Sequence, residues 1–191
     1  MIERGIPAMF ARICTVSAAL CLLSISIPAQ TAAKEFSQDD FKKMQGRWIG
    51  TFTGSFVGDG ISTEKGVSYT TRCTTHWVIP GRMTRWIYTL TKQGDDKPTT
   101  TYAGIVYWKE STKEVLGHSV TDEGTTYDEK MTRFGVIVER EKKGTGPKGD
   151  FTETEMNDWS NPDKPTLVQT VQFKSGEKVM TRSSLQRQTK N

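Results

Sequence analysis

The sequence predicts an all-β protein, a single antiparallel up-and-down barrel of eight to ten strands preceded by a short helical turn. Residues alternate with period two in several runs, as in Tyr69-x-Thr71-x-Cys73-x-Thr75-x-Trp77, which is the pattern of a strand with two different faces. Turn-forming residues divide the chain at short, regular intervals. No helical pattern separates these runs, so neighbouring strands are expected to be antiparallel hairpins rather than parallel βαβ units.

The first 33 residues have the three parts of a secretory signal peptide. Arg4 and Arg12 form the positive flank, an apolar stretch follows over 13–27, and small residues occupy 28–33. We expect cleavage after Ala33, with Ala29 as the alternative site. The apolar stretch is shorter than the ~20 residues that span a bilayer, so removal is favoured over a retained anchor. The sequence therefore predicts a periplasmic or secreted protein whose barrel domain covers 34–191.

The segment from Glu35 to Met44 carries the signals of one helical turn, with Ser37 as its cap and Phe41 and Met44 as apolar contacts. Beyond it, threonine is abundant, and threonine suits a pleated, half-solvated surface better than a helix interior. About ten candidate strands lie between turn signals, which fall at 58–60, 80–81, 94–96, 110–112, 122–124, 134–135, 144–149, 161–163 and 175–176.

An open sheet of this many strands would expose two long edges and an apolar face, whereas a barrel removes the edges and encloses a lumen. Removal of the signal peptide leaves Cys73 as the only cysteine, so no disulfide within the chain is expected. A small exported domain without a disulfide depends on its core, and this also favours a closed sheet.

Composition excludes several classes of protein. The mean hydropathy of −0.54 excludes an integral membrane protein after signal removal. The net charge is only +4, and both signs are interspersed along the chain, whereas a nucleic-acid-binding protein gathers its positive charge into a stripe. Five Trp, five Tyr and eight Phe supply more apolar area than a disordered chain contains.

Gly46-Arg47-Trp48, placed just after the helical turn, resembles the Gly-x-Trp signature that opens the first strand of lipocalins and other calycins. The whole mature chain also resembles secreted bacterial calycin-like proteins of unknown function. The resemblance implies an up-and-down barrel in which this Trp closes one end and a basic residue of the last strand packs over it. Arg182 and Arg187 are both candidates for that basic residue. The resemblance also implies a protein that binds a hydrophobic ligand.

A ligand-binding lumen needs large apolar walls and a few polar groups that orient the ligand. If Trp48, Phe52 and Phe56 face inward, strand parity predicts which other side chains share that face. The candidate ligand-binding residues are Tyr69, Trp77, Trp86, Tyr88, His118, Tyr127 and Glu129. Parity also places Phe151, Glu153 and Glu155 on this face, with the two carboxylates solvated or paired with Arg85, Arg133 or Arg140. Cys73 lies on this face and is expected to be an inert small hydrophobe.

His118 stands between apolar Leu116 and Val120 at strand parity, which predicts a partly buried histidine able to titrate near neutral pH. The alternative to ligand binding is a small barrel enzyme, an isomerase, cyclase or hydrolase, using His118 and Glu129 as an acid/base pair. A third alternative is a protein-interaction module that uses the outer face. The basic run from Arg140 to Lys143 is interpreted as an exposed face. Two histidines and one thiol make no recognisable metal set, so neither a metal nor a cofactor is expected.

Overall fold

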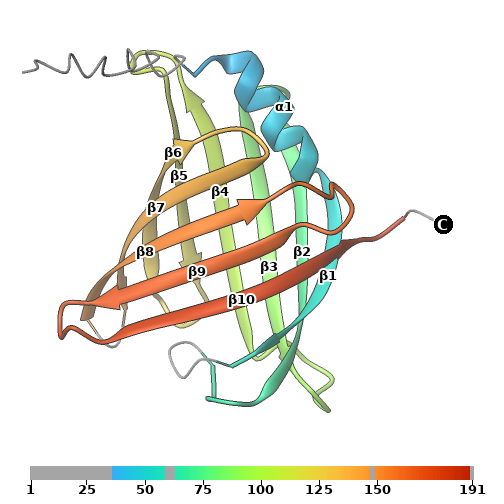
Figure 1. Ribbon diagram of the computed structural model, residues 1–191, viewed down its shortest axis with the longest axis vertical. Helices are drawn as coiled ribbons and strands as arrows, with labels where there is room; N and C mark the ends of the chain where they lie inside the picture. The colour runs from blue at the N-terminus through green and yellow to red at the C-terminus, as the bar shows by residue number, and fades with distance from the viewer. Residues whose placement is uncertain (1–35, 59–62, 147–148, 190–191) are drawn as a thin grey trace, which may run out of the picture. The chain divides into compact units, whose positions relative to one another are not determined.

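Ten antiparallel strands follow one helix in the computed structural model, which describes residues 36–58, 63–146 and 149–189 (Figure 1). The predicted signal peptide lies outside these described residues. The elements in chain order are α1 (Gln38–Trp48), β1 (Gly50–Val57), β2 (Ser68–Ile79), β3 (Met83–Lys92), β4 (Thr100–Lys109), β5 (Glu114–Thr121), β6 (Thr126–Arg133), β7 (Ile137–Gly146), β8 (Gly149–Asp158), β9 (Thr166–Phe173) and β10 (Lys178–Arg187).

The sheet is a closed barrel in which every strand pairs with its neighbours in sequence, and β1 also pairs with β10. The closing seam aligns Phe52 with Arg187 and Ser55 with Ser184. Several hairpin turns contain a glycine at positive φ, such as Gly81 at 70° and Gly176 at 91°, a conformation that favours glycine because it has no Cβ. The predicted all-β up-and-down barrel is confirmed, at the upper end of the expected strand number.

Helix α1 covers one end of the barrel (Figure 1). A capping box starts it: Ser37 Oγ accepts from the Asp40 amide, and the Asp40 carboxylate accepts from the Ser37 amide. Gln38 Nε2 donates to the Gly81 carbonyl in the β2–β3 turn, and Arg47 Nη1 donates to the Gly135 carbonyl in the β6–β7 turn. These bonds attach the helix to two hairpin turns at the same end of the barrel.

The prediction that Trp48 opens the first strand was wrong, because α1 continues to Trp48 and β1 begins at Gly50. Phe41, Met44 and Trp48 recur at the helical spacing of three and four, and all three are buried on the face of α1 that packs on the barrel. Trp48 also fits the period-two pattern that continues to Phe52. One residue satisfied both periodicities, and packing of the helix over the barrel end decided between them.

The apolar core occupies the α1 end of the barrel, where the helix meets the strands. Trp48 stands edge-on to Trp159, with ring centres 4.5 Å apart, and Phe52 is fully buried beside them. The buried residues that form this apolar cluster are Phe41, Met44, Trp48, Phe52, Cys73, Val106, Trp108, Val115, Met131, Val138, Trp159, Leu167 and Leu185. No helix among the described residues is long and apolar enough to cross a membrane.

Inward and outward faces follow the predicted parity on most strands, but not on β5. There Val115, Gly117 and Ser119 are buried, and His118 is exposed together with Val120. The register with both neighbouring strands fixes this orientation: Gly117 pairs with buried Val106 of β4 and buried Glu129 of β6, and His118 pairs with exposed Asp128. Glycine at 117 leaves room for the Glu129 side chain, because a Cβ there would stand 2.1 Å from Glu129 Oε1.

Candidate functional site

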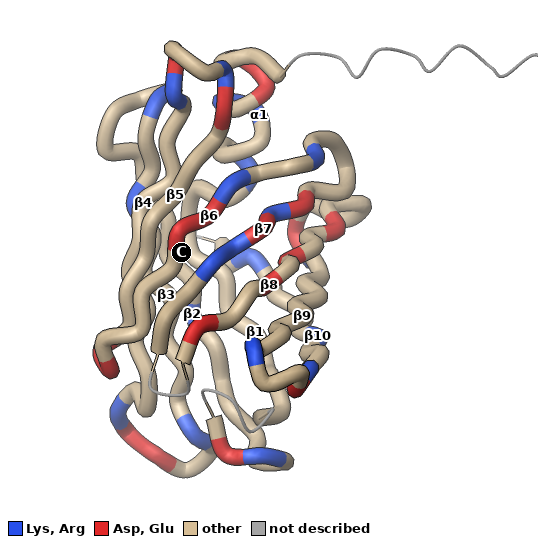
Figure 2. The backbone as a smooth tube through the Cα atoms, turned by 90° about the vertical axis from the view of Figure 1, so that its left-hand side faces the viewer, with Lys and Arg blue, Asp and Glu red and all other residues tan. Residues whose placement is uncertain are grey.

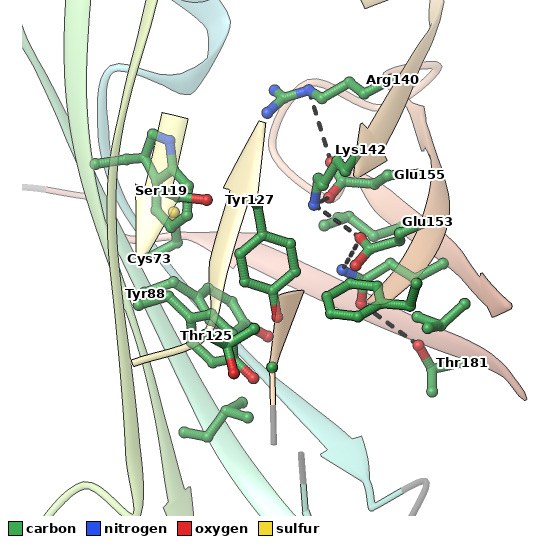
Figure 3. Close-up of a pocket in the computed structure, with 18 of the residues that line it drawn as sticks. Cys73, Tyr88, Ser119, Thr125, Tyr127, Arg140, Lys142, Glu153, Glu155 and Thr181 are labelled. Atoms are coloured by element: carbon green, nitrogen blue, oxygen red, sulfur yellow. Dashed lines mark hydrogen bonds and ion pairs between the residues drawn. The ribbon is translucent and has the colours of Figure 1, made fainter. Parts of the chain in front are cut away.

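The barrel encloses a cavity of about 270 Å³. The lining includes Glu123 and Thr125 of the β5–β6 turn, together with Gly146 at the end of β7 and Gly149 at the start of β8, so the cavity extends from the α1 end toward the opposite end of the barrel. Strands β2 to β4 supply a mostly apolar wall, formed by Cys73, Trp86, Tyr88, Leu90, Tyr102 and Val106. Strands β7 to β10 supply both kinds of side chain. Their apolar lining residues are Phe151, Leu167, Val171, Phe173 and Leu185, and their polar ones, called here the polar wall, are Arg140, Lys142, Glu153, Glu155, Gln169 and Thr181. Figure 3 shows Cys73 and Tyr88 on one side and the labelled charged residues on the other.

The polar wall is a hydrogen-bonded network that runs across four strands. Lys142 Nζ donates to Glu153 Oε1 at 2.8 Å and to Glu155 Oε2 at 2.6 Å. Gln169 Nε2 donates to Glu153, and the Thr181 hydroxyl donates to Gln169 Oε1 at 3.4 Å. Lys142 pairs with Glu153 and Arg140 with Glu155 in the β7–β8 register, so the strand pairing itself brings opposite charges together.

The side chain of Arg140 lies between two carboxylates, and all three are buried. Its Nη1 is 3.6 Å from Glu129 Oε2, and its Nε is 3.7 Å from Glu155 Oε1. Both are ion pairs longer than a good hydrogen bond. Figure 2 shows charges of both signs side by side along β6, β7 and β8. Part of this charge points into the lumen, where it is weakly screened.

Burial and neighbouring charges give the carboxylates different protonation behaviour. Burial raises the pKa of Glu129 above its ordinary value, and the nearby Arg140 charge only partly opposes this. Burial also disfavours the charge on Glu155, but the Lys142 and Arg140 charges outweigh it and lower the pKa of that carboxyl to about 2. Burial disfavours the ammonium of Lys142 too, yet the adjacent Glu153 and Glu155 raise its pKa. Lys142 and Glu155 are therefore a charged pair at neutral pH.

Cys73 is a free, buried thiol on the apolar wall. Burial raises the pKa of this thiol to about 11, so it stays protonated at neutral pH and is a poor nucleophile. Burial also raises the pKa of Tyr88 above its ordinary value, which keeps its hydroxyl neutral. Within the described ranges, no group of three or more His, Cys, Asp or Glu residues is arranged to hold a metal ion.

Three of the candidate ligand-binding residues, Trp86, Tyr88 and Tyr127, line the cavity. Tyr69 is buried, and its hydroxyl accepts a hydrogen bond from the Glu64 amide at 3.1 Å. Trp77 packs edge-on against Phe41 of α1. Neither Tyr69 nor Trp77 belongs to the cavity lining. The role of the three lining residues in binding stays a prediction.

His118 lies on the outer surface, where its Nδ1 is 2.8 Å from Asp128 Oδ1. Glu129 is buried on the inner face of β6 and pairs in register with Gly117, not with His118. The two side chains therefore leave the sheet on opposite faces, and the predicted acid/base pair of His118 and Glu129 was wrong. His118 is also wrong as a lumen residue, because β5 directs Gly117 and Ser119 inward and His118 outward.

Sequence reasoning named Arg140 among the possible partners of Glu153 and Glu155, and the structure pairs it with Glu155, but it missed Lys142 and the burial of both cations. The interpretation of the run from Arg140 to Lys143 as an exposed face was wrong for Arg140 and Lys142, which are largely buried. A signal was present, because Arg140 and Lys142 share the parity of Val138 on β7. Glu153 and Glu155 likewise share the parity of Phe151 on β8. Two period-two pairs of opposite charge on adjacent strands indicate a buried ladder of ion pairs.

No family model matches the sequence, and no curated protein matches it. Among solved structures, Rv2717c from M. tuberculosis is similar, with a TM-score of 0.59 and 14% identity over 77% of this chain and 96% of that chain. The S-type phycobiliprotein lyase CpeS from Guillardia theta is also similar, with a TM-score of 0.51 and 10% identity over 78% of this chain and 93% of that chain. This chain has a calycin-like barrel fold. At these identities the likeness concerns the fold, and function rests on the site.

The structure also shows which basic residue of the last strand contacts the Gly-x-Trp region. Arg187, not Arg182, does so: its Nη1 donates to the Ile49 carbonyl and its Nη2 to the Arg47 carbonyl. Its guanidinium lies 4.5 Å from the ring centre of Phe52. The cation that faces the ring of Trp48 comes instead from Arg140, at 5.9 Å.

Proposed function

We propose that this protein is an exported barrel that binds a small amphipathic molecule in its lumen. The observation that supports the proposal is the pairing of two unlike walls around one cavity of about 270 Å³. An aromatic wall takes the apolar part of a ligand, and each Å² of apolar surface removed from water is worth ~25 cal/mol. A wall of fixed, hydrogen-bonded polar side chains orients the remainder.

The polar wall suits binding because its charges are already paired. Lys142 holds Glu153 and Glu155, and Asn157 Nδ2 holds the second oxygen of Glu155 at 2.7 Å. A wall held by its own hydrogen bonds keeps its geometry without a ligand, so little ordering is needed when one binds. We expect the ligand to be recognised by a preformed cavity rather than by folding around it.

Export remains part of the proposal and rests on the N-terminal sequence alone. The positive flank, the apolar stretch 13–27 and the small residues before Ala33 are the features that support a cleaved signal peptide. We propose a periplasmic or secreted location for the mature chain, tested by N-terminal sequencing of the protein recovered from the periplasm or medium. Recovery of the protein in the cytosol with residues 1–33 intact would contradict it.

The interaction-module alternative has less support than lumen binding. Large apolar side chains exposed on the described surface include Val57 on β1, Val120 on β5 and Met180 on β10. Val78 and Ile79 are also exposed at the end of β2, and the remaining exposed apolar side chains belong to different elements. Scattered apolar side chains are common on soluble proteins. Binding of a partner on the outer surface would also leave the cavity inside the barrel without a role.

Titration of the intrinsic tryptophan fluorescence with fatty acids, quinones and haem tests the proposal, since Trp48 and Trp86 line the cavity. We expect a saturable change with at least one of these classes. Val171→Phe narrows the lumen and is expected to weaken that binding at least about tenfold. Val168→Phe, on the opposite face of β9, is the matched control and should change affinity by less than about twofold.

The proposal fails if no class of compound gives a saturable change. It also fails if Val168→Phe weakens binding as much as Val171→Phe, because the bound molecule would then lie outside the barrel.

A further inference from the structure

The described residues that line the cavity contribute four buried side-chain polar atoms without a hydrogen-bond partner. All four are N–H donors: Gln45 Nε2, Trp48 Nε1, Trp86 Nε1 and Arg140 Nε. Gln45, Trp48 and Arg140 are each more than nine-tenths buried. Buried donors are rarely left without acceptors in folded proteins, so four at one cavity require an explanation.

The four donors belong to one region of the lumen, next to α1. Gln45 and Trp48 lie one turn apart on the buried face of the helix. The Gln45 amide oxygen accepts from the Thr84 hydroxyl, and Trp86 is the next inward residue of the same strand. Arg140 completes the series, because its guanidinium lies 5.9 Å from the ring centre of Trp48. The four residues are thus linked by one helical turn, by the hydrogen bond between Gln45 and Thr84, and by the contact of Arg140 with Trp48.

The acceptors of this region are engaged by the protein itself. Gln45 Oε1 is bonded to Thr84, and Glu155 accepts from Lys142 and Asn157. The carboxylate oxygens of Glu129 lack hydrogen bonds, but Glu129 is not part of the cavity lining. Among the buried side-chain polar atoms of the described residues that line the cavity and lack a hydrogen-bond partner, all are therefore donors and none is an acceptor.

Charge narrows the chemistry further. Arg140 faces Glu129 and Glu155, and Lys142 faces Glu153 and Glu155, so the cations already have carboxylate partners. An anionic ligand head would add a buried negative charge without a counter-ion, which is costly in a dry site. A cationic head would meet N–H donors rather than acceptors. A neutral group that accepts hydrogen bonds fits both conditions.

We propose that the α1 end of the lumen is a subsite for the neutral carbonyl group of an otherwise apolar ligand, a ketone, quinone, ester or amide. Its oxygen has two lone pairs and accepts from Trp86 and from one further donor among Gln45, Trp48 and Arg140. This assignment rests on the proposed function and specifies its ligand class. The apolar body extends along Tyr88, Leu90 and Tyr102, away from the donors.

The test is calorimetric titration of the purified chain with four probes that share one ring system: naphthalene, 2-acetylnaphthalene, 2-naphthoate and 2-(aminomethyl)naphthalene. We expect 2-acetylnaphthalene to bind about tenfold more tightly than naphthalene, because its carbonyl accepts hydrogen bonds that are otherwise unmade. The carboxylate and the amine are expected to bind no more tightly than naphthalene.

A variant assigns the effect to the subsite. Trp86→Phe keeps an aromatic ring and removes one donor. Because the ratio of ketone to naphthalene affinity cancels the loss of ring contact that both probes share, this ratio should fall several-fold. Trp108→Phe is the matched control: the Trp108 indole N–H donates to Glu110, and this residue does not line the cavity. The control should keep the parent ratio. Thermal melts of both variants establish that they are folded. The comparison of the four probes on the parent protein does not depend on either variant.

Each result has a defined meaning. If naphthalene binds and the ketone has no advantage, or if the carboxylate or amine binds as tightly as the ketone, the subsite is wrong while lumen binding stands. If Trp86→Phe keeps the parent ratio, or Trp108→Phe loses it, the donors named here are wrong. If none of the four probes binds and the fatty acid, quinone and haem titrations are also negative, both the subsite and the proposed function are overturned.

Discussion

Single glycines decide where large side chains fit inside this barrel. Gly117 leaves room for Glu129, and Gly104 leaves room for the Trp86 ring, since a Cβ there would stand 2.6 Å from Trp86 Cζ2. Both glycines lie on the inner face of the sheet, opposite a bulky partner on the adjacent strand. A glycine in a strand interior usually weakens it, and here it allows close packing that a larger residue would block.

Gly117→Ala is expected to destabilise the protein by about 1–3 kcal/mol, because the added methyl collides with the buried Glu129 side chain and displaces it from Arg140. Gly46→Ala is the matched control, since a Cβ at Gly46 meets no atom within 4 Å and the residue lies within α1. Alanine there should raise stability by about 0.5–1 kcal/mol. Urea unfolding of both variants measures these changes, and a Gly117→Ala protein as stable as the parent would show that Glu129 moves freely.

At the scale of the element, α1 and the last strand hold each other at the closed end of the barrel. The last carbonyls of a helix have no partner within it. Arg187 of β10 supplies donors to the carbonyls of Arg47 and Ile49 at that end, and Asp163 lies 3.3 Å from its Nε. One side chain thus joins the helix end, the first strand and the closing seam.

Arg187→Lys should lower the free energy of unfolding by about 1–3 kcal/mol, because an ammonium group does not reproduce the planar, forked geometry of two simultaneous bonds. Arg182→Lys on the same strand is the control, and its exposed side chain predicts a change within about 0.5 kcal/mol. Chemical denaturation at neutral pH compares the two. Equal losses in both variants would contradict the role assigned to Arg187.

For the whole molecule, the closed barrel places ionisable groups in an interior that also holds a cavity. Burying a charge is costly unless it is paired, and the pairs here join β7 with β6 and β8. Stability therefore depends on the charge state of the lumen, and the pKa values of Glu129 and Glu155 are shifted in opposite directions.

The pH dependence of stability follows from these directions. The pKa of Glu155 falls from 4.5 to about 2 on folding, so Glu155 stabilises the protein above about pH 4.5, and this contribution is lost as the pH falls toward 2. Glu155→Gln should cost about 3 kcal/mol at pH 7 and flatten the acid limb. The pKa of Glu129 is raised on folding, so its contribution is complete below about pH 4.5 and declines as the pH rises through the folded value.

Glu129→Gln is therefore the opposite case, and its stability at pH 7 should equal or exceed that of the parent. Urea unfolding at pH 3, 5 and 7 distinguishes the two variants. A larger loss at pH 7 in Glu129→Gln than in Glu155→Gln would reverse the protonation assignment.

The sequence by itself determined the antiparallel up-and-down pairing of the strands and limited their number to between eight and ten, because turn residues and period-two runs act over short distances along the chain. It also placed Trp86, Tyr88 and Tyr127 on the inner face, from the period-two pattern of their own strands. Only the tertiary structure decided the orientation of His118 and the helical state of Trp48. Each of these depends on what the neighbouring strand or helix presents. A side chain is buried or exposed according to the space and charge opposite it, and no local pattern contains that information.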